Sequence, residues 1–372
     1  MIDHNFTGPA FTIGIEEELM IVDGETGDLA QAIDPILSRV PDDLAGTVKP
    51  ELMQSVLEIA TTPCAGISQA MAELTSMRRA VIGIAEAQGL RIGAAGTHPF
   101  AEPDDQLIVD LPRYRELAAE LAFIARQEII FGTHVHVAIE GADRAIYVAD
   151  GIRRYLPMLL ALSANSPFWR GKATGMMSAR TPIFRAFPRV GVPPHYGTWE
   201  IYAHRVEMMM RAGAIEDYTY MWWDVRPHPN LGTVETRVFD QQTRLDHTAA
   251  LGALTLAIAH RLSRQYDDEI PLVGQPTELV DDNKVRAALR GMEGELVDFW
   301  AERRVPAPEM ARRVLDEIRE DAQELGCEAE LEGIEDLLEH GGEARRQLDM
   351  WDGEADLRPI IDEIVEKTYP ST

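Results

Sequence analysis

The most constraining feature of the chain is segment 13–21, Ile-Gly-Ile-Glu-Glu-Glu-Leu-Met-Ile, in which three carboxylates interrupt an apolar run. Apolar and β-branched residues on both sides predict a buried β-strand. Side chains alternate along a strand, so Glu16 and Glu18 share one face and Glu17 takes the other. An unpaired buried carboxylate is costly, and two on one face repel each other. The simplest partner for both is a divalent metal ion.

Three further segments place charged or imidazole side chains inside apolar stretches: Glu51 and Glu58 in 50–59, His134 and His136 in 132–137, and Glu235 and Arg237 in 232–239. Each segment alone has an ordinary explanation, because a lone histidine in a strand is usually a core residue and a nearby Glu and Arg usually form a surface ion pair. Together they would bury several carboxylates in one sheet. Oxygen-rich sites with an imidazole suit Mg²⁺ or Mn²⁺ better than Zn²⁺. The sequence therefore predicts a site for several metal ions.

Composition limits the classes of partner. A net charge of −27 argues against nucleic acid and anionic membranes as partners. Two cysteines are too few for a disulfide scaffold and suit a reducing cytoplasm. The first residues lack a signal-peptide pattern, and the longest apolar stretch is too short to cross a bilayer. We therefore expect a cytoplasmic protein that acts on small molecules.

The order of expected elements indicates an α+β fold. Strands are expected at 11–22, 54–61, 90–95 and 133–139, with a hairpin at 220–239, and helices at 68–89, 113–130 and 143–164. Strands that return between helices predict one domain over 1–372, with helices on one face of a mostly antiparallel sheet. The sheet is expected within about 11–264. Residues 265–372 are expected to form an acidic, solvated helical region.

Hard metal ions beside arginines are typical of phosphoryl transfer, in which the metals offset charge on phosphate oxygens. The chain has no Gly-x-x-x-x-Gly-Lys-Ser/Thr loop, no Gly-x-Gly-x-x-Gly after a strand and no kinase signature. If ATP binds, metals and arginines must therefore hold its phosphates.

Several motifs resemble the bacterial glutamate–cysteine ligase type 2 family, whose members are also called carboxylate–amine ligases. They lie, in order, at 14–18, 49–61, 132–136 and 233–237, with further similarity at 164–169, 178–180 and 222–227. The resemblance runs from about residue 11 to 264. The C-terminal third shares only its helical character.

The resemblance implies a glutamine-synthetase-like fold, with a curved antiparallel sheet as the floor of the active site. It implies ATP-dependent joining of a glutamate-like carboxylate to an amine through an acyl phosphate, with weak glutamate–cysteine ligase activity. The ligands of Mg²⁺ (or Mn²⁺) carried over from the family are Glu16, Glu18, Glu51, Glu58, His134 and Glu235. Arg237 would stabilise the transferring phosphoryl group, and Arg180 would hold phosphate or the substrate carboxylate.

Two other functions fit the same residues. A metal-dependent phosphohydrolase would use these carboxylates to activate water, and a binding protein would keep the fold without turnover. The sequence leaves open the amine acceptor and the roles of Glu17 and His136. It also leaves open the oligomeric state, for which a homodimer is favoured.

Overall fold

The computed structural model describes residues 2–353 and 356–370. Its centre is a seven-stranded sheet in the order β2-β3-β1-β5-β9-β8, with β4 also paired to β1, and each of these pairings is antiparallel. The strands of this sheet are β1 (Ile13–Asp23), β2 (Val48–Pro50), β3 (Val56–Ala60), β4 (Leu90–Gly93), β5 (Gly132–Ala138), β8 (Val225–His228) and β9 (Thr233–Asp240).

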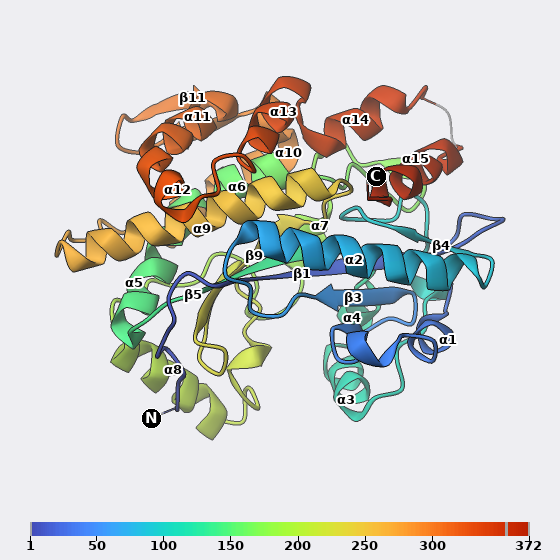
Figure 1. Cartoon of the computed structure of the whole chain (residues 1–372), viewed down its shortest axis with the longest axis horizontal. Coiled ribbons are helices and arrows are strands. Elements are labelled where there is room, and N and C mark those ends of the chain that lie inside the picture. The colour runs from blue at the N-terminus through green and yellow to red at the C-terminus, as the bar shows by residue number, and fades with distance from the viewer. Residues whose placement is uncertain (1, 354–355, 371–372) are drawn as a thin grey trace.

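Two long helices, α2 (Ile67–Glu86) and α9 (Leu245–Asp267), run along one side of the sheet, and the C-terminal helices lie beyond α9 (Figure 1). Shorter helices lie on the opposite side. The remaining helices are α1 (Ile33–Leu37), α3 (Pro112–Leu121), α4 (Phe123–Arg126), α5 (Ala142–Ile152), α6 (Leu156–Ser163), α7 (Arg180–Phe184), α8 (Trp199–Arg211), α10 (Thr277–Arg290), α11 (Ala307–Glu317), α12 (Arg319–Leu325), α13 (Glu332–His340), α14 (Gly342–Met350) and α15 (Arg358–Thr368).

The alternation of β1 separates a core face from a polar face. Ile13 and Ile15 are buried in the main apolar core, which they share with residues of α2 and α9. Helix α9 approaches β1 closely because it carries Gly252 there. A Cβ at this position would lie 2.8 Å from Cδ1 of Ile67 and 3.2 Å from Cδ1 of Ile15. A larger residue would therefore push the helix away from the sheet.

Glu17 is the one carboxylate of β1 that points into this core, where it meets Arg78 of α2. Arg78 Nε and Nη2 each donate to Glu17 at 2.7 Å, and both side chains are fully buried. The remaining guanidinium hydrogen atoms reach carbonyl oxygens of Gln242, Thr243 and Thr368. The pair therefore joins β1, α2, the segment after β9 and the C-terminal helix α15.

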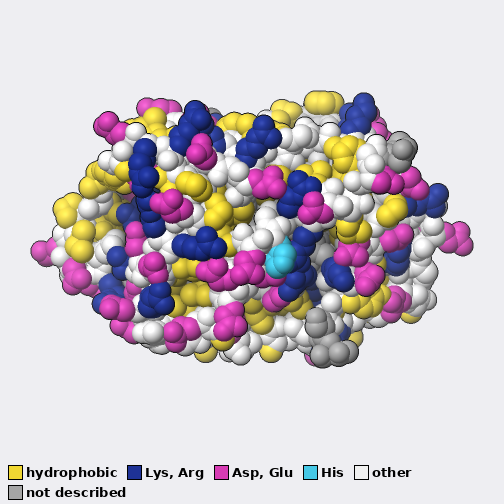
Figure 2. All heavy atoms as spheres, turned by 90° about the horizontal axis from the view of Figure 1, so that it is seen from above, with side chains coloured by type: hydrophobic (Ala, Val, Ile, Leu, Met, Phe, Trp, Pro, Cys, Tyr) yellow, Lys and Arg dark blue, Asp and Glu magenta, His cyan; other side chains and the backbone are white. Residues whose placement is uncertain are grey.

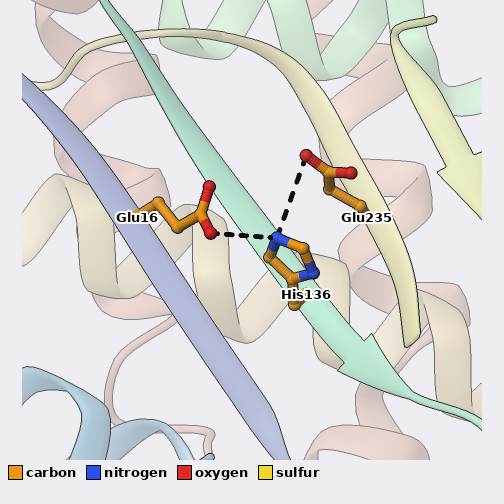
Figure 3. Close-up of side chains that lie close together, drawn as sticks. All are labelled: Glu16, His136 and Glu235. Carbon is orange, nitrogen blue, oxygen red and sulfur yellow. Dashed lines mark ion pairs between the residues drawn. The ribbon is translucent and has the colours of Figure 1, made fainter. Parts of the chain in front are cut away.

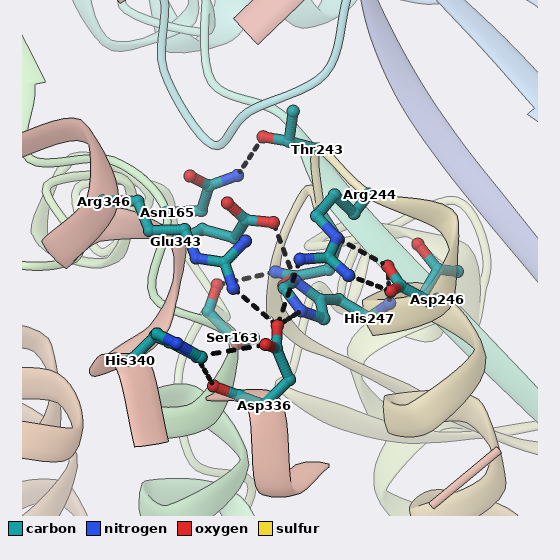
Figure 4. A network of polar contacts seen from close by, with 12 residues as sticks. Ser163, Asn165, Thr243, Arg244, Asp246, His247, Asp336, His340, Glu343 and Arg346 are labelled. Carbon is teal, nitrogen blue, oxygen red and sulfur yellow. Dashed lines mark hydrogen bonds and ion pairs between the residues drawn. The ribbon is translucent and has the colours of Figure 1, made fainter. Parts of the chain in front are cut away.

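A second polar network anchors the C-terminal helices to α9 (Figure 4). His247 of α9 is buried, with Nδ1 2.7 Å from Glu343 of α14 and Nε2 2.7 Å from Asp336 of α13. Asp336 also accepts from Arg244 at 3.1 Å and from Arg346 at 2.5 Å. The acidic C-terminal region is thus held by specific charge pairs as well as by apolar packing.

The predicted α+β class and antiparallel sheet are confirmed, but several predicted elements are wrong in detail. The expected helix 143–164 is divided into α5 and α6 by a 3-10 turn at Arg153–Tyr155. The expected helix 113–130 is divided into α3 and α4 at Ala122, whose φ is 49°, outside the helical region. The expected all-helical tail contains a hairpin of β10 (Glu295–Asp298) and β11 (Arg303–Pro306). Its strands are short and follow Gly291, which ends α10, and Gly294, which ends a single 3-10 turn after it.

The outer side of the C-terminal region is not uniformly acidic. Figure 2 shows acidic and basic side chains interspersed over this side of the molecule. Pairs such as Arg312–Glu335 and Arg345–Glu293 account for part of this pattern. Over residues 2–353 and 356–370, no helix has both the length and the apolar composition needed to cross a membrane.

We predict that Arg78→Ala lowers the free energy of unfolding by about 3–5 kcal/mol, because it leaves the Glu17 charge buried without its partner. Arg319→Ala, which removes an exposed pair with Asp316, is the control and should cost less than about 1 kcal/mol. Urea unfolding of both variants measures the difference. Equal losses would show that the buried pair is not a main support of the fold.

Candidate functional site

The register of the sheet brings the predicted ligands onto one face. In an antiparallel pair, residues directly opposite each other point to the same side. Glu18 lies opposite Glu58, and Glu16 lies opposite His134. His136 lies opposite Glu235 on the next strand. Four strands therefore contribute to a single polar surface on the face opposite α2 and α9.

Glu16, His136 and Glu235 form a compact group at the centre of this surface (Figure 3). His136 Nε2 lies 3.5 Å from Glu16 Oε1 and 3.8 Å from Glu235 Oε1. One ligand atom from each residue lies within 4.8 Å of the others, a spacing that could surround a metal ion. Burial alone would lower the pKa of His136, but the carboxylates of Glu16 and Glu235 outweigh it and raise that pKa.

His134 lies between Glu16 and Glu18. Its Nδ1 is 3.1 Å from Glu16 Oε2, and its Nε2 is buried without a hydrogen-bond partner among the described residues, 4.0 Å from Glu18 Oε1. Burial and the guanidinium of Arg237 lower the pKa of His134. This favours the neutral imidazole, which is the form that binds metals.

Glu51 and Glu58 form a second acidic group beside Glu18. Burial, together with the charges of Glu58 and Glu18, raises the pKa of Glu51 well above its usual value. Burial and the charge of Glu16 raise the pKa of Glu58 to about 7, although Lys49 lies 3.4 Å away. The two carboxyl groups therefore resist ionising together unless a further cation joins them.

Glu235 differs from the other carboxylates because two guanidinium groups already contact it. Arg226 Nη2 lies 2.6 Å from Glu235 Oε2, and Arg237 pairs with Oε1. Burial opposes ionisation of Glu235, but the two arginines lower its pKa well below the usual range. Arg237 is thereby held beside both Glu235 and His134, whose Nδ1 is 3.5 Å from Arg237 Nη1.

Arg180 is positioned by the segments 164–169 and 178–180. It begins α7 and is buried, and its backbone N–H donates to Ser166 Oγ at 3.1 Å. The hydroxyls of Ser166 and Ser178 donate in turn to Asp240 at 2.7 and 2.9 Å. Arg180 Nε is buried without a hydrogen-bond partner in the described part of the chain. These motifs therefore fix the start of α7, from which Arg180 reaches the polar surface.

A cavity of about 220 Å³ lies over the polar surface. The predicted residues that line it are Glu16, Glu18, Glu51, Glu58, His134, Arg180 and Arg237. Phe184, Phe187 and Trp222 line the same cavity. One cavity thus combines carboxylates, guanidinium groups and aromatic side chains.

A family model described as glutamate–cysteine ligase family 2 matches residues 12–365. The chain belongs to this family. A relative from Rubrobacter xylanophilus, provisionally named glutamate–cysteine ligase 2-1, is 42% identical over 370 residues, which cover 100% of this chain and 98% of the relative. The predicted family is therefore confirmed over the C-terminal third as well, which the sequence motifs did not reach.

Two solved structures share the fold of this family 2 protein. The glutamate–cysteine ligase of Francisella tularensis, solved in complex with AMP, has a TM-score of 0.73 at 14% identity and covers 99% of this chain and 89% of its own. A bifunctional glutathione synthetase of Pasteurella multocida has a TM-score of 0.68 at 15% identity and covers 97% of this chain and 53% of its own. At these identities the likeness concerns the fold alone.

Four charged or imidazole residues near the site were not assigned to it from the sequence. Arg113 of α3 lines the cavity. His136 shares a face with His134, as strand alternation indicates, but its role was left open. Arg226 stands opposite Glu235, which only the register of the β8–β9 hairpin reveals. Glu128 lies outside any strand, between α4 and β5, and lines the cavity. No local pattern in the sequence distinguishes it from a surface glutamate.

The residues present fit divalent cations. The Nε2 atoms of His134 and His136 are buried and have no hydrogen-bond partner within residues 2–353 and 356–370. Burial and the charge of Glu58 raise the pKa of Glu51, and burial and the charge of Glu16 raise that of Glu58, so a bound cation would favour ionisation of both. Carboxylate oxygens with a neutral imidazole nitrogen, as in His134, are ligands that Mg²⁺ and Mn²⁺ accept. The donor set therefore agrees with the metal predicted from the sequence.

Because the folded pKa of Glu58 is about 7 and the usual value is 4.5, the folded protein binds this proton more tightly than the unfolded chain. Stability should therefore fall as pH rises from about 5 to 7, by up to about 3 kcal/mol with EDTA present. Glu58→Gln cannot ionise and should flatten this decline. Urea midpoints between pH 5 and 8, with and without Mg²⁺, measure the effect. An unchanged pH profile in the variant would contradict the assignment.

Proposed function

We propose that the protein joins a glutamate-like carboxylate to an amine at the expense of ATP, through an acyl phosphate. The observation that carries the proposal is the single cavity in which carboxylates from distant segments face Arg180 and Arg237. Membership of glutamate–cysteine ligase family 2 supports a ligase. The AMP bound in the Francisella tularensis structure supports an adenine nucleotide as co-substrate.

In the proposed reaction an oxygen of the substrate carboxylate attacks the γ-phosphorus of ATP, and the bond to the ADP oxygen breaks. The amine nitrogen then attacks the acyl carbon, and the bond between this carbon and the phosphate oxygen breaks. Phosphate leaves with the electron pair of that bond, and the nitrogen loses a proton. Water must not compete with the amine, since it would hydrolyse the acyl phosphate. The cavity walls from Phe184, Phe187 and Trp222 would limit that access.

The residues proposed to hold Mg²⁺ or Mn²⁺ are Glu16, Glu18, Glu51, Glu58, His134 and Glu235, and the structure adds His136 as a candidate. These residues would hold metal ions that supply positive charge to offset the negative charge of the ATP phosphates. The role of Glu235 is also structural, since it pairs with Arg226 and Arg237. It therefore sets the position of Arg237 as well as contributing an oxygen atom.

Arg237 is the proposed donor to the transferring phosphoryl group. Glu235 raises its pKa, so the guanidinium stays charged in spite of burial. A cation fixed in place before the reaction stabilises the transition state without having to reorganise. Arg180 would hold a substrate carboxylate or a phosphate, and its buried Nε leaves one donor available.

Hydroxylamine provides a direct test, because this small amine converts an acyl phosphate into a stable hydroxamate. The protein is incubated with ATP, Mg²⁺, glutamate and hydroxylamine or cysteine, and ADP and product are measured. We expect ADP release only when carboxylate and amine are both present. Release of phosphate without either would indicate a phosphohydrolase. If neither ADP nor phosphate is released under any condition, the protein would be a binding protein without turnover.

We predict that Arg237→Lys lowers kcat by about 10²–10³, because lysine keeps the charge but loses the fixed donor geometry. The KM for ATP should change by less than about threefold, since the proposed metal ligands, which would hold its phosphates, are unchanged. Arg185→Lys is the matched control, because Arg185 pairs with Asp281 outside the cavity. Activity within twofold of wild type for Arg237→Lys would remove Arg237 from the reaction.

A further inference from the structure

Glu128 is a partly buried residue for whose carboxyl group neither the fold nor the proposed chemistry yet accounts. It precedes β5 and lines the cavity together with Glu18 and Arg180. Its Oε2 atom is buried, and among the described residues it has no hydrogen-bond partner and no cationic side chain in an ion pair with it. A buried acceptor without a donor is costly, so its presence in a substrate cavity indicates a ligand.

The other acidic side chains of the cavity have donors of their own. Glu16 contacts His134, Glu18 accepts from the backbone of Gly132, and Glu58 contacts Lys49. Glu51 accepts from the N–H of Leu52. Glu128 therefore differs from them in lacking, within the described residues, a contact that offsets its charge.

The charges around Glu128 favour a particular kind of ligand. Burial and the charge of Glu18 raise its pKa to about 8, while Arg180 and Arg237 act in the opposite direction. Arg180 and Glu128, which line the same cavity, together suit a ligand in which a carboxylate lies beside an ammonium group. Arg180 can bind the carboxylate, and Glu128 can bind the ammonium group.

We propose that Glu128 binds the α-ammonium group of the carboxylate substrate and thereby selects an α-amino acid over a plain dicarboxylate. The inference rests on the proposed function, because it assigns a role within the same cavity. Glu128 acts in this scheme as a specificity residue, at the end of the substrate remote from the phosphorylated carboxylate. Arg180 would hold the neighbouring α-carboxylate.

The test compares glutamate with glutarate, which has the same two carboxylates and no amino group. In the hydroxamate assay with ATP and Mg²⁺, wild type should prefer glutamate by about 10- to 100-fold in kcat/KM, the range for a hydrogen bond between charged groups. Glu128→Gln should lose most of this preference through a higher KM for glutamate. Its activity with glutarate should stay within about threefold of wild type.

Two further variants make the comparison decisive. Glu128→Asp keeps the charge and should retain part of the preference, which guards against a folding defect in the Gln variant. Glu116→Gln, an exposed glutamate of α3 outside the cavity, is the matched control. An equal loss of activity with glutamate and glutarate in Glu128→Gln would overturn the proposal, as would a wild-type enzyme without preference.

Failure of the ligase function and failure of this inference give different results. If wild type forms no hydroxamate from any carboxylate, the proposed function fails. Calorimetric titration with glutamate and glutarate then decides the role of Glu128 by itself. Tighter binding of glutamate that disappears in Glu128→Gln would support the inference, and equal affinities would overturn it.

Discussion

The buried ion pair between Glu17 and Arg78 is the interaction on which the rest of the structure depends. Glu17 accepts from Arg78 through both carboxylate oxygens and also from Thr248 and Gln241. Its neighbours Glu16 and Glu18 point the other way and repel each other. A strand carrying three adjacent acidic residues needs a strong internal contact to keep its register. Arg78 provides that contact from the core side.

Glutamate residues on the two faces of β1 therefore have different roles, in the core on one side and in the cavity on the other. On the core side, one carboxylate is fully satisfied by a guanidinium and by uncharged donors. On the cavity side, Glu16 and Glu18 of β1 lie among acidic residues from other segments, and the pKa values of Glu51, Glu58 and Glu128 are raised. This surplus of negative charge is an unfavourable feature of the free protein. In the proposed chemistry, bound cations would offset this charge.

Much of the polar surface could be predicted because alternation along a strand is a local property. The side on which Glu16, Glu18 and His134 lie follows from the sequence, once 13–21 and 132–137 are read as strands. The pairing of Glu18 with Glu58, or of Glu235 with Arg226, depends on register between distant segments and could not be predicted in this way. The local sequence around Ala122 does not predict that the helix breaks there, and the short strands of the hairpin β10–β11 give only a weak strand pattern. Glu128 was missed because its role depends on the cavity above it and on no periodic pattern.

The contact between Arg78 and the carbonyl oxygen of Thr368 spans 290 positions of the chain, at 3.2 Å. One acceptor of the central guanidinium is therefore synthesised long after its donor. On the ribosome, α2 and β1 leave the exit tunnel well before this acceptor exists. The core side of the sheet can therefore reach its final hydrogen-bonded state only after translation of α15.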